Sequence, residues 1–182
     1  MTNTEFDSEQ YADRNPYPNI PPIIESLETE YVNSGITSSV AIAGHPIHPI
    51  IVVFPVAFLT AAAGSDIGYW LTDDLFWSRV STWAIGLGLV AGILAALVGM
   101  LDFFKVPRVR KRTAGWAHMI LNITALILTA INFGLRLDNP NFIVPLGVII
   151  SLLVATLLGP GGWYGGELSF RHKIGVIGPN QT

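Results

Sequence analysis

Four long stretches of this chain carry almost no charge, and they restrict its fold more than any other feature. Residues 80–101 and 140–166 contain no Asp, Glu, Lys or Arg, residues 113–135 contain only the titratable His118, and an apolar run from 49 continues past Asp66 to 71. About 20 helical residues at roughly 1.5 Å each cross the ~30 Å hydrocarbon layer of a membrane. A soluble bundle would need polar outer faces, which these stretches lack. We therefore predict an all-α, integral membrane four-helix bundle with a polar N-terminal tail, its helices at about 48–71, 80–104, 114–136 and 141–160.

The composition agrees with a membrane protein and excludes several other classes. Hydrophobic residues make up 51% of the 182 positions and charged residues 13%, about half the usual charge of a soluble domain. The net charge of −3 and the pI of about 5.7 argue against a nucleic-acid partner. Because the chain has no cysteine, disulfides and thiolate metal sites are excluded. The expected partner is the lipid bilayer.

Charge divides the chain into two parts. The first thirty residues carry a net charge of −6, and the remainder is mildly basic. We predict an acidic, proline-containing tail over 1–35, with a short amphipathic helix built on Ile23, Ile24, Leu27 and Tyr31. The alternative is a tail that is mostly solvated. The rest, 36–182, forms the four-span domain and ends in a glycine-rich segment.

The distribution of Lys and Arg predicts the orientation. Seven bases lie between the second and third spans or after the fourth, whereas the other side has only Arg79 and Arg136. Cytoplasmic loops carry the excess of such residues. We expect both termini in the cytoplasm, with the chain in an inner or thylakoid-type membrane.

Glycine is prominent in the second and fourth spans. The four-residue spacings Gly88/Gly92 and Gly161/Gly165 permit close approach of helices. The run from Gly159 through Pro160 to Glu167 is poor in helix-forming residues. We expect this run to break the fourth helix.

All four histidines fall on the predicted cytoplasmic side. His45 and His48 begin the first span, His118 lies near the start of the third, and His172 follows the fourth. Histidine and carboxylate are ligands for transition metals, and two histidines from different helices can hold a haem. The sequence predicts one cofactor site here, for haem b or a transition-metal ion. The cofactor-binding residues are His48 and His118 first, then His45 and His172, and a metal ion would add Asp102 and Glu167 from the same side.

Neighbouring residues suggest how this site is held. If residues 45–49 turn helically, His45 and His48 share one face, stiffened by Pro46 and Pro49. Asn122 lies one turn after His118 and is placed to orient its ring. Asp102 could bind the metal, accept from a histidine or pair with a loop base.

A further carboxylate lies near the opposite interface. Asp66 follows His48 by 18 residues, about 27 Å along a helix. We expect it to be buried and bonded to Arg136 or Asn132 of a neighbouring helix.

Two motifs resemble a known family. Gly44-His-Pro-Ile-His-Pro49, followed by Phe54-Pro55 and Asp66, and the segment Gly165-Gly-Glu-Leu-Ser-Phe-Arg-His-Lys-Ile-Gly-Val176 resemble the bacterial membrane family known as domain of unknown function 2231. The resemblance covers about 40–178 and implies a four-span membrane protein. Some family members are joined to Rieske-type redox domains, which favours electron transfer, although the family has no assigned reaction.

These observations lead to a main hypothesis and two alternatives. The main one is electron transfer through one haem b or metal ion, with quinone as a candidate partner. No hydrolase elbow or His-Glu-x-x-His motif occurs, which favours a redox carrier over an enzyme. The first alternative is a cofactor-free accessory or structural subunit of a larger membrane complex or homo-oligomer. The second is an ion or proton carrier using Asp66 and Asp102.

Overall fold

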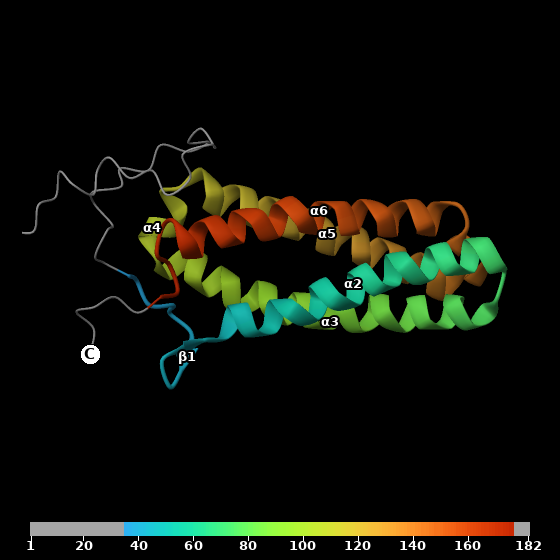
Figure 1. The fold of residues 1–182 in the computed structure, drawn as a ribbon, viewed down its shortest axis with the longest axis horizontal. Helices are drawn as coiled ribbons and strands as arrows, with labels where there is room; N and C mark the ends of the chain where they lie inside the picture. Colours follow the sequence, from blue (N-terminus) through green and yellow to red (C-terminus); the bar gives the residue numbers. More distant parts are fainter. Residues whose placement is uncertain (1–34, 177–182) are drawn as a thin grey trace, which may run out of the picture.

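The computed structural model describes residues 35–176, and the predicted tail helix lies outside them. Four long helices run side by side (Figure 1): α2 (Ile47–Thr72), α3 (Leu75–Lys105), α5 (Thr113–Asp138) and α6 (Leu146–Phe170). Each is long and apolar enough to cross a membrane. The all-α, four-span architecture is thereby confirmed, and α2, α3 and α5 begin and end within a few residues of the expected spans.

The helices form two antiparallel hairpins, α2–α3 and α5–α6. Across the bundle α2 packs on α6, and α3 packs on α5. This order places α2 and α5 on opposite corners of the bundle. Side chains that point inward from these two helices can therefore meet at its centre.

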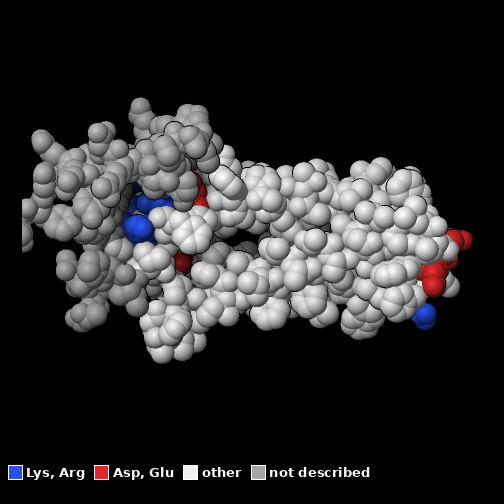
Figure 2. Space-filling view, in the orientation of Figure 1, with Lys and Arg blue, Asp and Glu red and all other residues white. Residues whose placement is uncertain are grey.

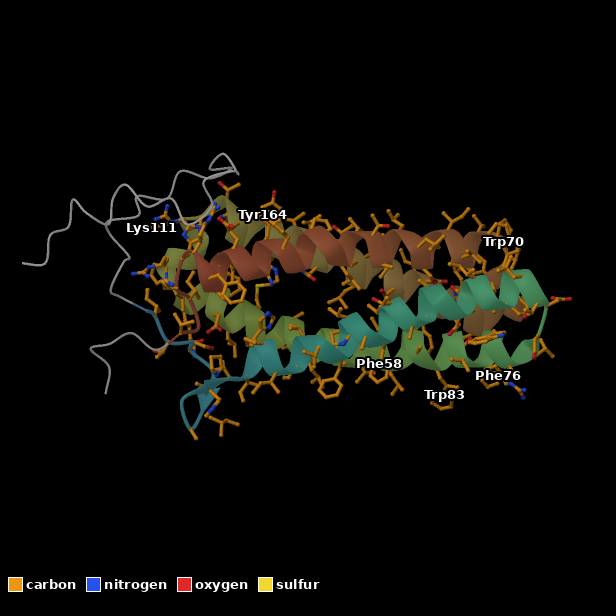
Figure 3. The ribbon with its side chains drawn as sticks, in the orientation of Figure 1. Phe58, Trp70, Phe76, Trp83, Lys111 and Tyr164 are labelled. Atoms are coloured by element: carbon orange, nitrogen blue, oxygen red, sulfur yellow. The ribbon has the colours of Figure 1, made fainter. Side chains whose placement is uncertain are left out.

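The outer surface of the bundle is apolar, as lipid contact requires. Trp83 on α3 is 73% exposed, and Phe76 also points outward (Figure 3). In water such a continuous apolar surface would be costly. The exposed faces and the helix lengths together describe a membrane-embedded protein.

The two ends of the bundle differ in charge (Figure 2). One end contains the short helix α4 (Pro107–Arg110), and we call it the basic end because it contains Lys105, Arg108, Arg110, Lys111, Arg112, Arg171 and Lys173. At the opposite end α2 and α3 are joined by Asp73 and Asp74 alone. Asp73 adopts the left-handed conformation that ends α2, and the Asp74 side chain caps α3 by accepting from the Phe76 N–H at 2.9 Å.

The fourth helix differs from the prediction. The 3-10 turn η2 (Pro140–Ile143) precedes it, and α6 begins only at Leu146. It then continues without a break through Pro160 and the glycine-rich run to Phe170. The expected break is wrong because a helix keeps backbone groups paired inside a membrane. In addition, Gly161 and Gly165 give room to side chains of α5.

A segment crosses the basic end before α2 begins, and we call residues 35–46 the strap. Ile36 pairs with the chain after α6: its N–H donates to the Lys173 carbonyl at 2.9 Å, and its carbonyl accepts from Gly175 at 2.7 Å. The strap ends in a small hairpin of β1 (Ala41–Ile42) and β2 (His45–Pro46). Ala43 and Gly44 turn this hairpin with positive φ angles.

Near the opposite end, a buried polar network joins all four helices. Arg136 of α5 pairs with Asp66 of α2, as expected, and its Nη1 lies 2.8 Å from Asp66 Oδ1. The guanidinium also donates to Ser81 of α3 at 2.7 Å, to Asn132 at 2.9 Å and to Ser151 of α6 at 3.2 Å. All five side chains are nearly inaccessible. Since the charges cancel and the donors of Arg136 are used, the network explains Asp66 as a structural residue.

Candidate functional site: a pair of histidines

Two of the predicted ligands meet between the four helices, near the basic end of the bundle. His48 lies in the first turn of α2 and His118 in the second turn of α5, on opposite corners of the bundle. Their ring centroids are 6.0 Å apart, and the ring planes are nearly perpendicular, at 84°. Both rings line the same cavity.

Each ring is held by a backbone carbonyl of the partner helix in its own hairpin. His48 Nδ1 lies 2.9 Å from the Ala95 carbonyl oxygen of α3, and His118 Nδ1 lies 2.7 Å from that of Gly161 on α6. Because a carbonyl only accepts, Nδ1 carries the proton in both bonds. In the neutral ring Nε2 then keeps its lone pair, which is the state of a metal-binding histidine.

Each ring also rests against a glycine. A Cβ on Gly99 would lie 2.7 Å from His48 Cε1, and one on Gly165 would lie 2.9 Å from His118 Cε1. Both distances are too short for real carbon atoms. Each glycine follows the carbonyl residue by four positions, so the carbonyl and the glycine lie on one face of the helix. The Gly161/Gly165 spacing therefore makes room for side chains of α5.

The two hairpins thus share one arrangement of a histidine, a carbonyl and a glycine. The sequence analysis did not predict this repeat. In each, a histidine on the first helix bonds a carbonyl on the second and lies over the glycine one turn later. The two charged residues of the buried network also correspond, since Asp66 follows His48 by 18 residues and Arg136 follows His118 by the same number. This equal spacing is the feature of the sequence from which the repeat of the two hairpins could have been predicted.

Two cavities adjoin His48, and the first of them is also lined by His118. The first lies toward the basic end and, counting the part open to the surface, holds about 820 Å³ of space that protein atoms do not fill. The second extends toward the middle of the bundle and holds about 460 Å³. Both are lined by His48, Ala96, Asn122 and Leu126, and otherwise mainly by apolar side chains. A narrow hollow between the hairpins is visible in Figure 2.

Three of the other predicted ligands, His45, Glu167 and His172, do not line the cavity that contains the pair. His45 is exposed in β2, with Nδ1 2.9 Å from the Ala43 carbonyl oxygen; α2 begins only at Ile47, so His45 and His48 share no helix face. Glu167 forms an ion pair with Arg171 at 3.0 Å. Over residues 35–176, no three His, Asp or Glu side chains converge in a metal-binding group.

Asn122 contacts the ring of His118, as expected, whereas the bonds of Asp102 to the strap were not predicted from the sequence. Asp102 lines the first cavity and accepts hydrogen bonds from the strap serines Ser38 and Ser39. Asn122 Nδ2 donates to the His118 carbonyl at 2.7 Å and lies 3.3 Å from its Nδ1. It therefore holds the backbone of the ligand residue as well as touching the ring.

His172 is buried beside the basic end. Its side chain is inaccessible, and within the described part of the chain neither ring nitrogen has a hydrogen-bond partner. Burial, and to a smaller extent the nearby charges of Arg112, Arg171 and Arg108, lower the pKa of His172 to about 4. His172 is therefore neutral at physiological pH.

Comparison with known protein families matches residues 44–178 to the predicted membrane protein family DUF2231. The chain belongs to this family. The match starts at Gly44 in the turn of the strap hairpin and includes all four helices, so it contains the whole histidine site. Searches of curated proteins and of solved structures returned no match.

Proposed function

We propose that His48 and His118 would together hold one haem b through their ring nitrogens, and that the protein transfers electrons in the membrane. The observation that carries the proposal is the pair itself. Two imidazoles from opposite corners of the bundle approach to 6.0 Å, and each is fixed through Nδ1 so that Nε2 is the basic nitrogen. Carbonyl-anchored histidines of this kind are typical metal ligands.

The spacing and the cavities fit such a group. Metal–nitrogen bonds of about 2 Å on opposite sides of one ion separate two imidazole centroids by roughly 6 Å. The first cavity extends from the pair toward the basic end, and the second extends from His48 toward the middle of the bundle. Their apolar walls, including Met100, Met119 and Phe103, suit a flat hydrophobic group.

The number of ligands favours haem over a bare ion. Haem iron takes two axial ligands from the protein, whereas a zinc or similar ion takes three or four. When bound, haem supplies one-electron transfer. The residues of this chain orient it through the anchored rings and exclude water through the apolar wall. Quinone is a candidate electron partner, because it shares the bilayer with the exposed helices.

Detergent-purified protein tests the proposal directly. We expect a Soret band that shifts on dithionite reduction, and about one iron per chain by metal analysis. His48→Ala and His118→Ala should each abolish the band, whereas His45→Ala is the matched control, because His45 lies outside the cavity. A stoichiometric metal without a Soret band would indicate that the site binds a metal ion and not haem. Absence of both would overturn the proposal.

One observation favours the alternative of a cofactor-free subunit of a larger complex or homo-oligomer. Gly64, Gly159 and Gly162 have no atom of another segment within 4 Å of a Cβ position, so the described bundle leaves room for another helix beside each. Native purification distinguishes the two functions. A stable partner protein on a bundle that contains no cofactor would support the subunit.

A further inference from the structure

One carboxylate fixes the middle of the strap to the bundle. Asp102 near the end of α3 accepts from Ser38 Oγ at 2.7 Å, from the Ser39 N–H at 2.6 Å and from Ser39 Oγ at 2.7 Å. Both carboxylate oxygens are used. The two bonds from Ser39 are exposed at the edge of the bundle, so water can compete for them, whereas Ser38 is buried.

The strap is also a wall of the cavity that contains the histidine pair. Ser38 and Pro46 line this cavity from the strap, and Ile174 and Gly175 line it from the segment that pairs with Ile36. Together they lie across its basic end. Asp102 lines the same cavity, so the bonds that hold the strap lie at the rim.

Beyond Ser39 the strap leads directly into the helix that contains His48. The Ile47 N–H, at the start of α2, donates to the Val40 carbonyl at 3.1 Å. The other anchors of the strap, at Ile36, are backbone bonds at its far end. The Asp102 bonds therefore hold the middle of the strap, between one fixed end and α2.

We infer that the strap is a gate over the histidine cavity and that Asp102 is the positioning residue that keeps it closed. Water-soluble molecules from the basic end reach His48 and His118 faster when the bonds between Asp102 and the two serines open. The inference deepens the proposed function, because it assigns regulated access to the same site. It concerns the cavity wall and holds whether the cavity contains haem or no cofactor.

Thiol labelling tests the gate, since the chain has no cysteine of its own. Met100→Cys places one thiol in the cavity wall, and Lys111→Cys places one on the exposed basic end as the matched control. A charged maleimide is added to detergent-purified protein. We expect Met100→Cys to react at least tenfold more slowly than Lys111→Cys. Adding Asp102→Asn should accelerate only the cavity thiol, by about tenfold.

A second variant locates the effect in the strap. Ser38→Ala combined with Ser39→Ala removes the two hydroxyl donors without changing any membrane-spanning helix, so it serves even if Asp102→Asn does not fold. It should accelerate labelling of the cavity thiol in the same way. Two results would overturn the gate. One is fast labelling of Met100→Cys when no other residue is changed. The other is a labelling rate of the Met100→Cys thiol that neither Asp102→Asn nor the double serine substitution alters. Neither result bears on haem, and absence of a Soret band would leave the labelling result intact.

Discussion

At the scale of single residues, the site depends on two glycines as much as on the two histidines, because a glycine leaves room for each ring. The rings of His48 and His118 lie within 3 Å of the positions that a Cβ on Gly99 or Gly165 would take. The two histidines were predictable from the sequence, because they begin helices that run in the same direction. The two glycines were not, because which glycine faces a ring depends on the rotation of each helix.

Alanine at these glycines should displace the rings. We expect Gly99→Ala and Gly165→Ala each to reduce the haem bound per chain at least tenfold, since the new methyl group would lie within 3 Å of a ring atom. Gly162→Ala is the control on the same helix as Gly165. It meets nothing within 4 Å and should preserve the spectrum and stabilise the helix by about 0.5–1 kcal/mol. A normal spectrum in Gly165→Ala would contradict the ring placement.

The buried His172 predicts a pH dependence of stability. Its folded pKa of about 4 lies below the ordinary value of 6.5, so the unfolded chain binds the proton more readily. Stability from this group is complete above pH 6.5 and is lost as the pH falls from 6.5 toward 4. At pH 5 the loss reaches about 2 kcal/mol.

Thermal unfolding in detergent at pH 7 and pH 5 measures this effect. His172→Phe keeps a ring of similar size and removes the titration. The decrease in the melting temperature between the two pH values should therefore be smaller in the variant than in the parent protein. An equal decrease in both would show that His172 does not titrate in this way.

At the scale of elements, apolar length predicted the helices well, and local propensity predicted the end of α6 poorly. A glycine in a helix interior costs about 1 kcal/mol and a proline about 3 kcal/mol. An unpaired backbone group in hydrocarbon costs several kcal/mol. The membrane therefore favours continuing the helix through residues 159–166, and the contacts with α5 add to this preference.

The link between the hairpins depends on the ion pair of Asp66 and Arg136. Because both side chains are buried, Asp66→Asn should leave an uncompensated guanidinium charge and reduce the free energy of unfolding by about 3–5 kcal/mol. The double variant Asp66→Leu with Arg136→Leu removes both charges and should be less destabilised than Asp66→Asn. Thermal unfolding of the three proteins checks the order. A double variant less stable than Asp66→Asn would contradict it.

At the scale of the whole molecule, the basic residues at the two ends predict the orientation of the bundle in the membrane. Arg136 belongs to the buried network, so the opposite end exposes fewer bases than a count along the sequence indicates. Of the two bases assigned to that side, Arg79 is the one outside the network. This strengthens the prediction that the basic end faces the cytoplasm.

Single cysteines at the two ends measure the orientation. Asp73→Cys lies in the turn at the opposite end and Lys111→Cys at the basic end, and both positions are exposed. With a membrane-impermeant maleimide on intact cells, we expect Asp73→Cys to react. Lys111→Cys should react only after the cells are permeabilised. The reverse pattern would invert the orientation.

The matched positions of Asp66 and Arg136 have a consequence for assembly. If either hairpin paired with a copy of itself, two like charges would face each other in a dry interior, where no counter-charge is available. Only pairing of the α2–α3 hairpin with the α5–α6 hairpin places the Asp66 charge beside the opposite charge of Arg136. The two halves are therefore obligate complements, and a chain cut between α4 and α5 should recover its fold from the two fragments together but from neither fragment alone.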